Sequence, residues 1–287
     1  MRRITEWLLL SALLAGGVMV AAAADDTMSP PKVLTVTREF VKPGKGGAMH
    51  DKAESAFVQA FARAKWPTHY LAVNSLSGKP RVLFLTGYDS FDAWEKDAKA
   101  IDKNAALSAA LDHASAADGD LLDSMDGGAL TLNEEYSLNP GVDIAHMRYF
   151  EISVYHIKPG HRHEWDEGMK MVLKGYQNTD MKWACYEGAF GFGDGTFVFF
   201  TPRKAGAEID GEAAQDKNFM SAMGDEGMKK LRELSAASIE SSETNLFAFN
   251  PKMSYVSDEW IKADPDFWKP KMAAPAAKKP AEKSGNQ

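Results

Sequence analysis

The sequence predicts an α+β protein made of two tandem copies of one folding unit. Short motifs recur along it in the same order, with a shift that falls from 116 to 111 residues. The repeated motifs are Lys42-Pro43-Gly44 with Lys158-Pro159-Gly160, Asp102-Lys103-Asn104 with Asp216-Lys217-Asn218, and Asn139-Pro140 with Asn250-Pro251. A slow drift of this kind is what a duplication followed by small loop deletions would leave.

Hydrophobic periodicity supports the repeat, because each copy begins with the same pair of elements. Residues 34–41 and 150–157 alternate with period two, which predicts strands ending at the Lys-Pro-Gly turns. A helix follows in each copy, because apolar residues recur at helical spacing. The expected buried faces are Met49, Ala53, Ala56, Phe57 and Ala60, then Trp165, Met169, Val172, Leu173 and Tyr176.

Two short strands and a turn come next in each copy, at 69–76 and 81–86, and at 185–192 and 196–201. Gly78 and Gly195 lie in the connections, where a hairpin needs a residue that tolerates positive φ. Helical segments follow at 91–125 and 212–238, and final strands at 130–138 and 243–249. Strand, helix, strand, strand, helix, strand is the ferredoxin-like order.

One such unit covers only one face of its sheet with helices. Two units in one chain can bury their open faces against each other, so we expect a barrel-like sandwich within a single polypeptide. The expected repeats span residues 32–141 and 146–256, and the protein would be a monomer with pseudo-two-fold symmetry or a higher homo-oligomer.

Both ends of the chain differ in composition from the repeats. Residues 1–24 combine a basic start, an apolar run and a small-residue site, which predicts a cleaved signal peptide and a periplasmic or secreted protein. A retained N-terminal anchor is the alternative; after signal cleavage no membrane span is expected. Residues 262–287, rich in Lys, Ala and Pro, are expected to be a disordered tail.

Charge and cysteine content exclude several function classes. The formal charge is −7, and it becomes −8 without residues 1–24, which argues against a nucleic-acid partner. Cys185 is the only cysteine, so no internal disulfide can form. The sequence also lacks a phosphate-binding Gly-rich loop, a Gly-x-Ser-x-Gly elbow and a zinc-type cysteine cluster.

The first strand of the second copy carries Glu151, Tyr155 and the Lys158-Pro159-Gly160 turn. This stretch resembles the first strand of the dimeric α/β-barrel superfamily, in particular its NIPSNAP-like members. The first copy departs from the pattern, with Thr35 and Glu39 at the Glu and Tyr positions. The resemblance implies the fold; because the superfamily includes cofactor-free monooxygenases, haem peroxidases and isomerases, it implies little about activity.

Two groups of residues are candidates for a small-molecule site. Glu151 and Tyr155, with Ser153, form a polar strand face that could line a cavity, and His156 is a second candidate base beside Glu151. The alternative is that these side chains only pack and form hydrogen bonds. The second group is aromatic and could line a pocket for a flat ligand or form ordinary core: Trp66, His69 and Tyr70, with Trp183 and Tyr186.

No metal site or cofactor is expected. His161 and His163 are two residues apart at a helix start and point to different sides, whereas a helical metal pair needs a spacing of three or four. A haem ligand from the last helical region is ruled out because residues 212–238 contain no histidine, and His113 is a weak substitute. Nothing near Cys185 marks it as activated.

Two functions are compatible with this sequence. The first is an exported protein that binds or transforms a small apolar or aromatic molecule in a barrel cavity, in the manner of a cofactor-independent oxygenase or isomerase. The alternative is a non-catalytic protein-interaction module in which the duplication only completes the fold.

Overall fold

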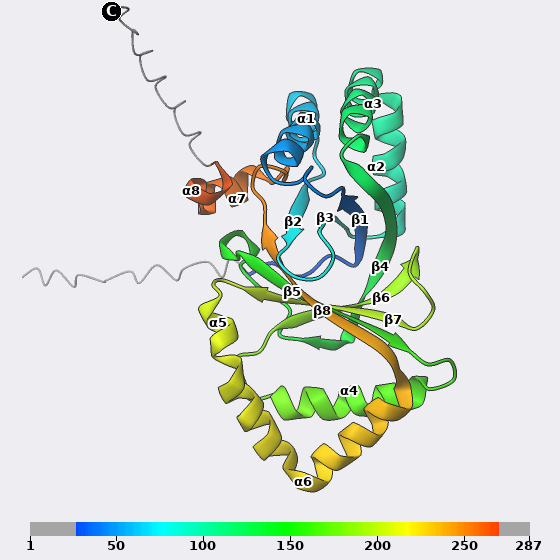
Figure 1. The fold of residues 1–287 in the computed structure, drawn as a ribbon, viewed down its shortest axis with the longest axis vertical. Helices are drawn as coiled ribbons and strands as arrows, with labels where there is room; N and C mark the ends of the chain where they lie inside the picture. Colours follow the sequence, from blue (N-terminus) through cyan, green and yellow to red (C-terminus); the bar gives the residue numbers. More distant parts are fainter. Residues whose placement is uncertain (1–26, 270–287) are drawn as a thin grey trace, which may run out of the picture.

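The computed structural model describes residues 27–269. Eight antiparallel strands close into one barrel, with helices layered on two opposite sides of it (Figure 1). The signal peptide expected at 1–24 lies outside the described residues. Among residues 27–269, no helix has the length and apolar character needed to cross a membrane.

The elements follow the predicted order twice. The first set is β1 (Val33–Val41), α1 (Ala48–Ala64), β2 (Tyr70–Ser75), β3 (Arg81–Tyr88), α2 (Phe91–Lys103), α3 (Ala105–Gly119) and β4 (Leu122–Leu138). After the short helix η1 (Ile144–His146), the second set is β5 (Tyr149–Ile157), α4 (Arg162–Tyr176), β6 (Trp183–Phe190), β7 (Thr196–Arg203), α5 (Ala207–Asp210), α6 (Glu212–Ser238) and β8 (Ile239–Phe249). Two short helices end the described chain, α7 (Asp258–Ala263) and α8 (Pro265–Trp268).

The strand order in the barrel is β1-β3-β2-β8-β5-β7-β6-β4. Within it, β4-β1-β3-β2 and β8-β5-β7-β6 have the same relative order. The two groups join at two places, where β2 pairs with β8 over three residues and β4 pairs with β6 from Ala129 to Leu138. Neither group has a free edge, so the barrel needs both halves of the chain.

The two Lys-Pro-Gly turns have the same local geometry. Gly44 and Gly160 have φ of 78° and 84°, which other residues adopt only with strain. A register shift also falls at the same place in both strands, between Phe40 and Val41 and between His156 and Ile157. The predicted hairpin glycines Gly78 and Gly195 likewise have positive φ, at 71° and 70°.

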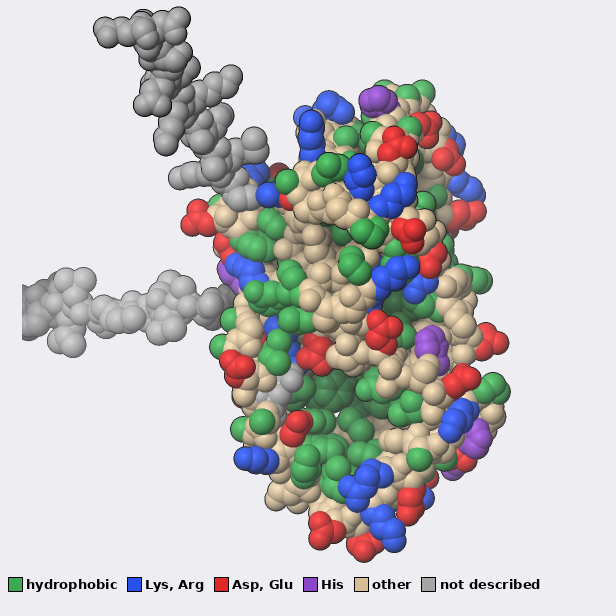
Figure 2. All heavy atoms as spheres, in the orientation of Figure 1, with side chains coloured by type: hydrophobic (Ala, Val, Ile, Leu, Met, Phe, Trp, Pro, Cys, Tyr) green, Lys and Arg blue, Asp and Glu red, His purple; other side chains and the backbone are tan. Residues whose placement is uncertain are grey.

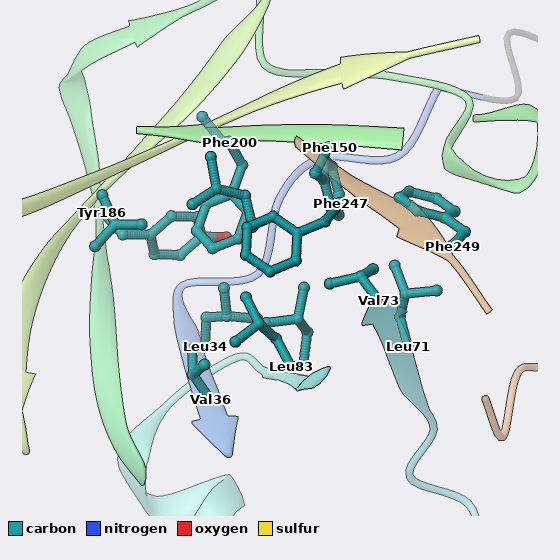
Figure 3. Packing of buried hydrophobic residues seen from close by; sticks show 14 of the residues in the cluster. Leu34, Val36, Leu71, Val73, Leu83, Phe150, Tyr186, Phe200, Phe247 and Phe249 are labelled. Atoms are coloured by element: carbon teal, nitrogen blue, oxygen red, sulfur yellow. The ribbon is translucent and has the colours of Figure 1, made fainter. Parts of the chain in front are cut away.

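The barrel interior is an apolar core to which the halves contribute different residue types. In Figure 3, aliphatic side chains of β1, β2 and β3 face aromatic side chains of β5, β6, β7 and β8. Phe150 contacts both Phe200 and Phe249, with ring centroids 5.5 and 4.8 Å apart. The aromatic set in the figure is Phe150, Tyr186, Phe200, Phe247 and Phe249.

The predicted inner face of α1 is wrong at Met49 but correct at Ala60, and that of α4 begins correctly with buried Trp165 and Met169. Met49 is 49% exposed, and the buried residues of α1 are His50, Glu54 and Ala60. Apolar periodicity does not identify His50 and Glu54 as inward-facing, because these two buried side chains are ionisable.

The long helical segment expected at 91–125 is also corrected. Asn104 ends α2 and caps α3, its side chain accepting a hydrogen bond from the Leu107 N–H at 3.1 Å. Helix α3 ends at Gly119, and β4 begins at Leu122 rather than at 130, because this stretch pairs with β1. Helix α6 covers 212–238 as expected but is kinked at Gly224, where φ is 64°.

The expected boundary of the C-terminal tail at 262 is too early. Helices α7 and α8 extend the folded chain to Trp268, which is 4% exposed and packs in the barrel core cluster. The Trp268 indole donates a hydrogen bond to the Ala145 carbonyl at 2.9 Å. Burial of this aromatic ring explains why the chain is folded as far as Trp268. The rest of the expected tail, from residue 270 onward, lies outside the described residues.

Replacing Leu130 with alanine should lower the free energy of unfolding by about 2–5 kcal/mol. The side chain is fully buried where β4 pairs with both β1 and β6, so the loss combines transfer free energy with a cavity. Chemical denaturation would measure the change. Leu76→Ala is the matched control, since Leu76 is 58% exposed and should change stability by less than about 0.5 kcal/mol. Equal effects of the two variants would contradict this packing.

Cys185 should not react with a thiol reagent while the protein is folded. It has no exposed surface, and burial raises the pKa of its thiol well above the usual value, with Glu187 adding to the effect. The expected result at pH 8 is no labelling in buffer and one label per chain in denaturant. Rapid stoichiometric labelling of the native protein would show that this part of β6 is not packed as described.

Candidate functional site

A cavity of about 770 Å³ lies where β1, β2, β5 and β6 begin and β3 and β7 end. We call it the barrel cavity. Its inner wall consists of apolar side chains from both halves: Leu34, Leu71, Leu85, Phe150, Ala184 and Phe200. Residues 28–32, 67–69 and 87–89 and part of 256–260 form its rim. The cavity therefore depends on barrel closure and on the C-terminal segment.

Four of the five aromatic residues singled out in the sequence line the barrel cavity. They are His69, Tyr70, Trp183 and Tyr186, two from each half of the chain. Trp66 does not line it; its indole donates a hydrogen bond to Asp97 at 3.0 Å. The structure thus brings the two predicted aromatic groups together around one space. Trp260, on α7, adds a further aromatic side chain that the sequence did not single out.

His69 is the histidine that lines this cavity, and it is held by stacking. Its ring lies 4.8 Å from the ring of Tyr255, at an interplanar angle of 22°. Burial lowers the pKa of His69 and outweighs the opposite effect of Asp258 and Glu259. Because the ordinary value is already near 6.5, the imidazole is neutral at pH 7 and can accept a proton.

The residues proposed as catalytic, all on β5, do not line this cavity. Glu151 faces the helices and accepts a hydrogen bond from Arg203 at 2.8 Å, whereas Phe150 and Ile152 face the barrel core. His156 Nδ1 lies 3.0 Å from the Thr196 hydroxyl. Glu151 and Tyr155 are four residues apart on one strand, a separation of about 13 Å. The structure therefore does not gather these three residues around one reacting atom.

Tyr155 lines a second, smaller cavity of about 240 Å³ between the barrel and helices α4 and α6. The kinked α6 forms a V beside α4 in Figure 1, and Figure 2 shows a hollow lined by hydrophobic side chains over this region. Ser153 also lines the space, with Trp165 and Met169 of α4. Burial raises the pKa of Tyr155, and the Glu151 charge adds to this, so its hydroxyl stays protonated.

A third feature was not predicted: four ionisable side chains are buried together between β1, α1 and α3. They are Glu39, His50, Glu54 and Asp118, and we call them the buried cluster. One ligand-type atom from each lies within 4.8 Å of all the others. His50 Nε2 is 3.1 Å from Glu39 Oε2, 3.2 Å from Asp118 Oδ1 and 3.9 Å from Glu54 Oε1.

Electrostatics in the buried cluster are strongly coupled. Burial raises the pKa of Glu54 to about 9, with the Glu39 and Asp118 charges adding to the effect. Burial alone would lower the pKa of His50, but its close contacts with the carboxyl groups of Asp118 and Glu39 outweigh that effect and raise the pKa to about 10. Burial also raises the pKa of Glu39. The buried cluster therefore holds three carboxyl groups around a single imidazole nitrogen.

The sequence contained one signal for this cluster. His50 and Glu54 are four residues apart on a predicted helix, which places both on one face. Glu39 and Asp118 could not be added without the fold, since β1 and α3 meet α1 only in three dimensions.

The histidines weighed for metal or haem in the sequence lie elsewhere. His161 Nδ1 is 3.6 Å from Glu164, and this pair is partly exposed at the start of α4. His163 and His113 are both exposed, on α4 and α3. Neither lines the barrel cavity or the smaller cavity.

No protein-family model and no curated protein matches the sequence. Solved structures do match it in fold. A proposed monooxygenase from Fusobacterium nucleatum is 13% identical, with a TM-score of 0.50, over 77% of this chain and 94% of that one. An anthrone oxidase-like protein is 16% identical, with a TM-score of 0.49, over 78% and 94%. A variant chlorite dismutase from Candidatus Nitrospira defluvii is 10% identical, with a TM-score of 0.46, over 82% and 96%.

Identities this low concern the fold alone. The eight-stranded closed barrel and the likeness to the Fusobacterium protein agree with the fold expected from the sequence. The chain has the dimeric α/β-barrel fold.

Proposed function

We propose that this protein binds a small apolar or aromatic molecule in the barrel cavity and transforms it there. The observation that carries the proposal is a cavity of about 770 Å³ with an apolar inner wall and four aromatic or imidazole side chains. Ligand sites in proteins typically occupy about 300–1,000 Å³ and combine apolar walls with a few polar groups. The monooxygenase description of the Fusobacterium protein supports a small-molecule role.

The reaction class that fits the cavity is one that begins with removal of a proton from the ligand. Neutral His69 is the proton acceptor in this proposal, and its stacking on Tyr255 fixes the ring plane. Such a step is common to cofactor-independent oxygenation and to isomerisation. Glu151, Tyr155 and His156 are not assigned a role in it, because none of them lines the barrel cavity.

We also infer that the chain arose by tandem duplication of a ferredoxin-like unit, with repeats at 32–141 and 146–256. The matching strand orders, turn glycines and register shifts of the two halves support this. The NIPSNAP-like stretch around Glu151 and export to the periplasm or medium remain proposals that rest on the sequence. A periplasmic location would expose the cavity to molecules that enter the cell envelope.

Narrowing the rim of the barrel cavity should weaken ligand binding. Ala93 lines the cavity from the first turns of α2, so Ala93→Trp places an indole at its rim without altering the barrel core. We expect at least about tenfold weaker binding of indole or 2-naphthol, followed by ligand-observed NMR. Ala100→Trp is the matched control, on an exposed position of the same helix. If both variants bind like the wild type, the ligand site is elsewhere; if wild type binds no probe at saturation, the interaction-module alternative gains weight.

His69 should titrate below its ordinary pKa near 6.5. Below pH 6.5 the unfolded chain then binds more protons at this position than the folded one, so His69 reduces stability as the pH falls. An NMR titration of the imidazole would test the first statement. Comparing the pH dependence of stability with that of His69→Phe, which keeps a ring against Tyr255, would test the second. A measured pKa at or above 6.5 would remove His69 from the role of neutral base.

A further inference from the structure

We propose that Glu39, His50, Glu54 and Asp118 form a binding site for one divalent transition-metal ion. The residues come from β1, from one face of α1 and from α3, so the closed fold is required to assemble them. The proposal concerns the helix-covered side of the barrel and does not depend on a ligand in the barrel cavity.

The donor set defines the class of ion. One imidazole nitrogen and three carboxylate groups are the ligands that Mn²⁺, Fe²⁺ and Zn²⁺ accept. Ca²⁺ and Mg²⁺ prefer oxygen ligands alone, so the central imidazole disfavours them. With no cysteine at the site, soft ions such as Cu⁺ are disfavoured as well.

The distances fit a common ion. Two ligand atoms that each lie about 2.1 Å from one metal are about 3.0 Å apart at adjacent octahedral positions, about 3.4 Å apart in tetrahedral geometry and about 4.2 Å apart at most. The three separations from His50 Nε2, at 3.1, 3.2 and 3.9 Å, fall in this range. The four ligand atoms all lie within 4.8 Å of one another, so a small movement of the side chains would let all four bind one ion.

Unpartnered atoms give an independent indication that something is bound. Glu54 Oε1 and Asp118 Oδ1 accept no hydrogen bond from any described residue. The two residues are 3% and 2% exposed, and each oxygen points at His50 Nε2 from less than 4 Å. Nε2 carries at most one hydrogen, so it can donate to only one of the three carboxyl groups around it. A buried acceptor without a partner is costly, and a cation would satisfy both.

The fold itself does not need these charges. In the second half, the corresponding space between β5 and α4 is filled by Tyr155 and Trp165, whose ring centroids are 5.5 Å apart. Aromatic packing therefore closes the same layer without a buried carboxylate. Placing three carboxylates here instead creates repulsion that a divalent cation would offset.

Tyr70 places the proposed ion next to the barrel cavity. Its hydroxyl is buried without a hydrogen-bond partner among the described residues, and its pKa is raised by burial and then by the charges of Glu54 and Glu39. The same residue lines the barrel cavity.

The test is metal uptake by chelator-stripped, tag-free protein, with Mn²⁺ or Zn²⁺ added alone and followed by calorimetry and thermal unfolding. We expect one ion per chain and a rise in Tm of roughly 5–10 °C at a concentration about 100 times the Kd. Glu54→Gln and Asp118→Asn keep the side-chain shape and should each weaken binding at least about tenfold. Both should fold without metal, because neither substitution adds a charge to the buried cluster or changes its packing.

Glu164→Gln is the matched control, since it removes a carboxylate beside a different histidine, His161, and should leave uptake unchanged. Wild-type protein that takes up neither ion would overturn the proposal, whatever the variants do. Uptake that survives in both Glu54→Gln and Asp118→Asn would overturn it too. These outcomes are separate from ligand binding in the barrel cavity, which the metal-free protein can be tested for on its own.

Discussion

Closure of the barrel is the constraint on which the rest of the structure depends. Each group of four strands has edges that must pair and an apolar face that must be covered, and the other group supplies both. The three-residue pairing of β2 with β8 is the shorter of the two junctions. The C-terminal segment reinforces this region, because Tyr255 exchanges backbone hydrogen bonds with Tyr70 and Trp268 packs in the same core.

Closure also creates two different environments for side chains. Inside the barrel, aliphatic residues of the first half meet aromatic residues of the second, and the space left between them at one end forms the barrel cavity. Outside, each half is covered by its own helices, so the two outer layers can diverge. One holds the buried cluster around His50, and the other holds the aromatic packing of Trp165.

Much of the fold could be predicted because strand alternation and turn glycines are local signals. Lys-Pro-Gly turns, hairpin glycines and the order of elements all depend on neighbours in sequence. The predictions were wrong where tertiary contacts determine which residues are buried or paired. Met49 was placed inward instead of His50, and the start of β4 was read as helix because its pairing with β1 is long-range. The aromatic residues around the barrel cavity could be found by comparing the copies, whereas the buried cluster joins residues far apart in the chain.

Native mass spectrometry of protein purified from an export-competent host would show whether the barrel cavity holds a small molecule. We expect a mass above that of the protein chain alone, from a bound apolar or aromatic compound that is released on unfolding. If the protein is purified without a bound compound, we expect aromatic probe compounds to bind to it. A spectrum that shows only the mass of the protein chain, before and after incubation with saturating aromatic probes, would mean that the barrel cavity does not bind such a molecule.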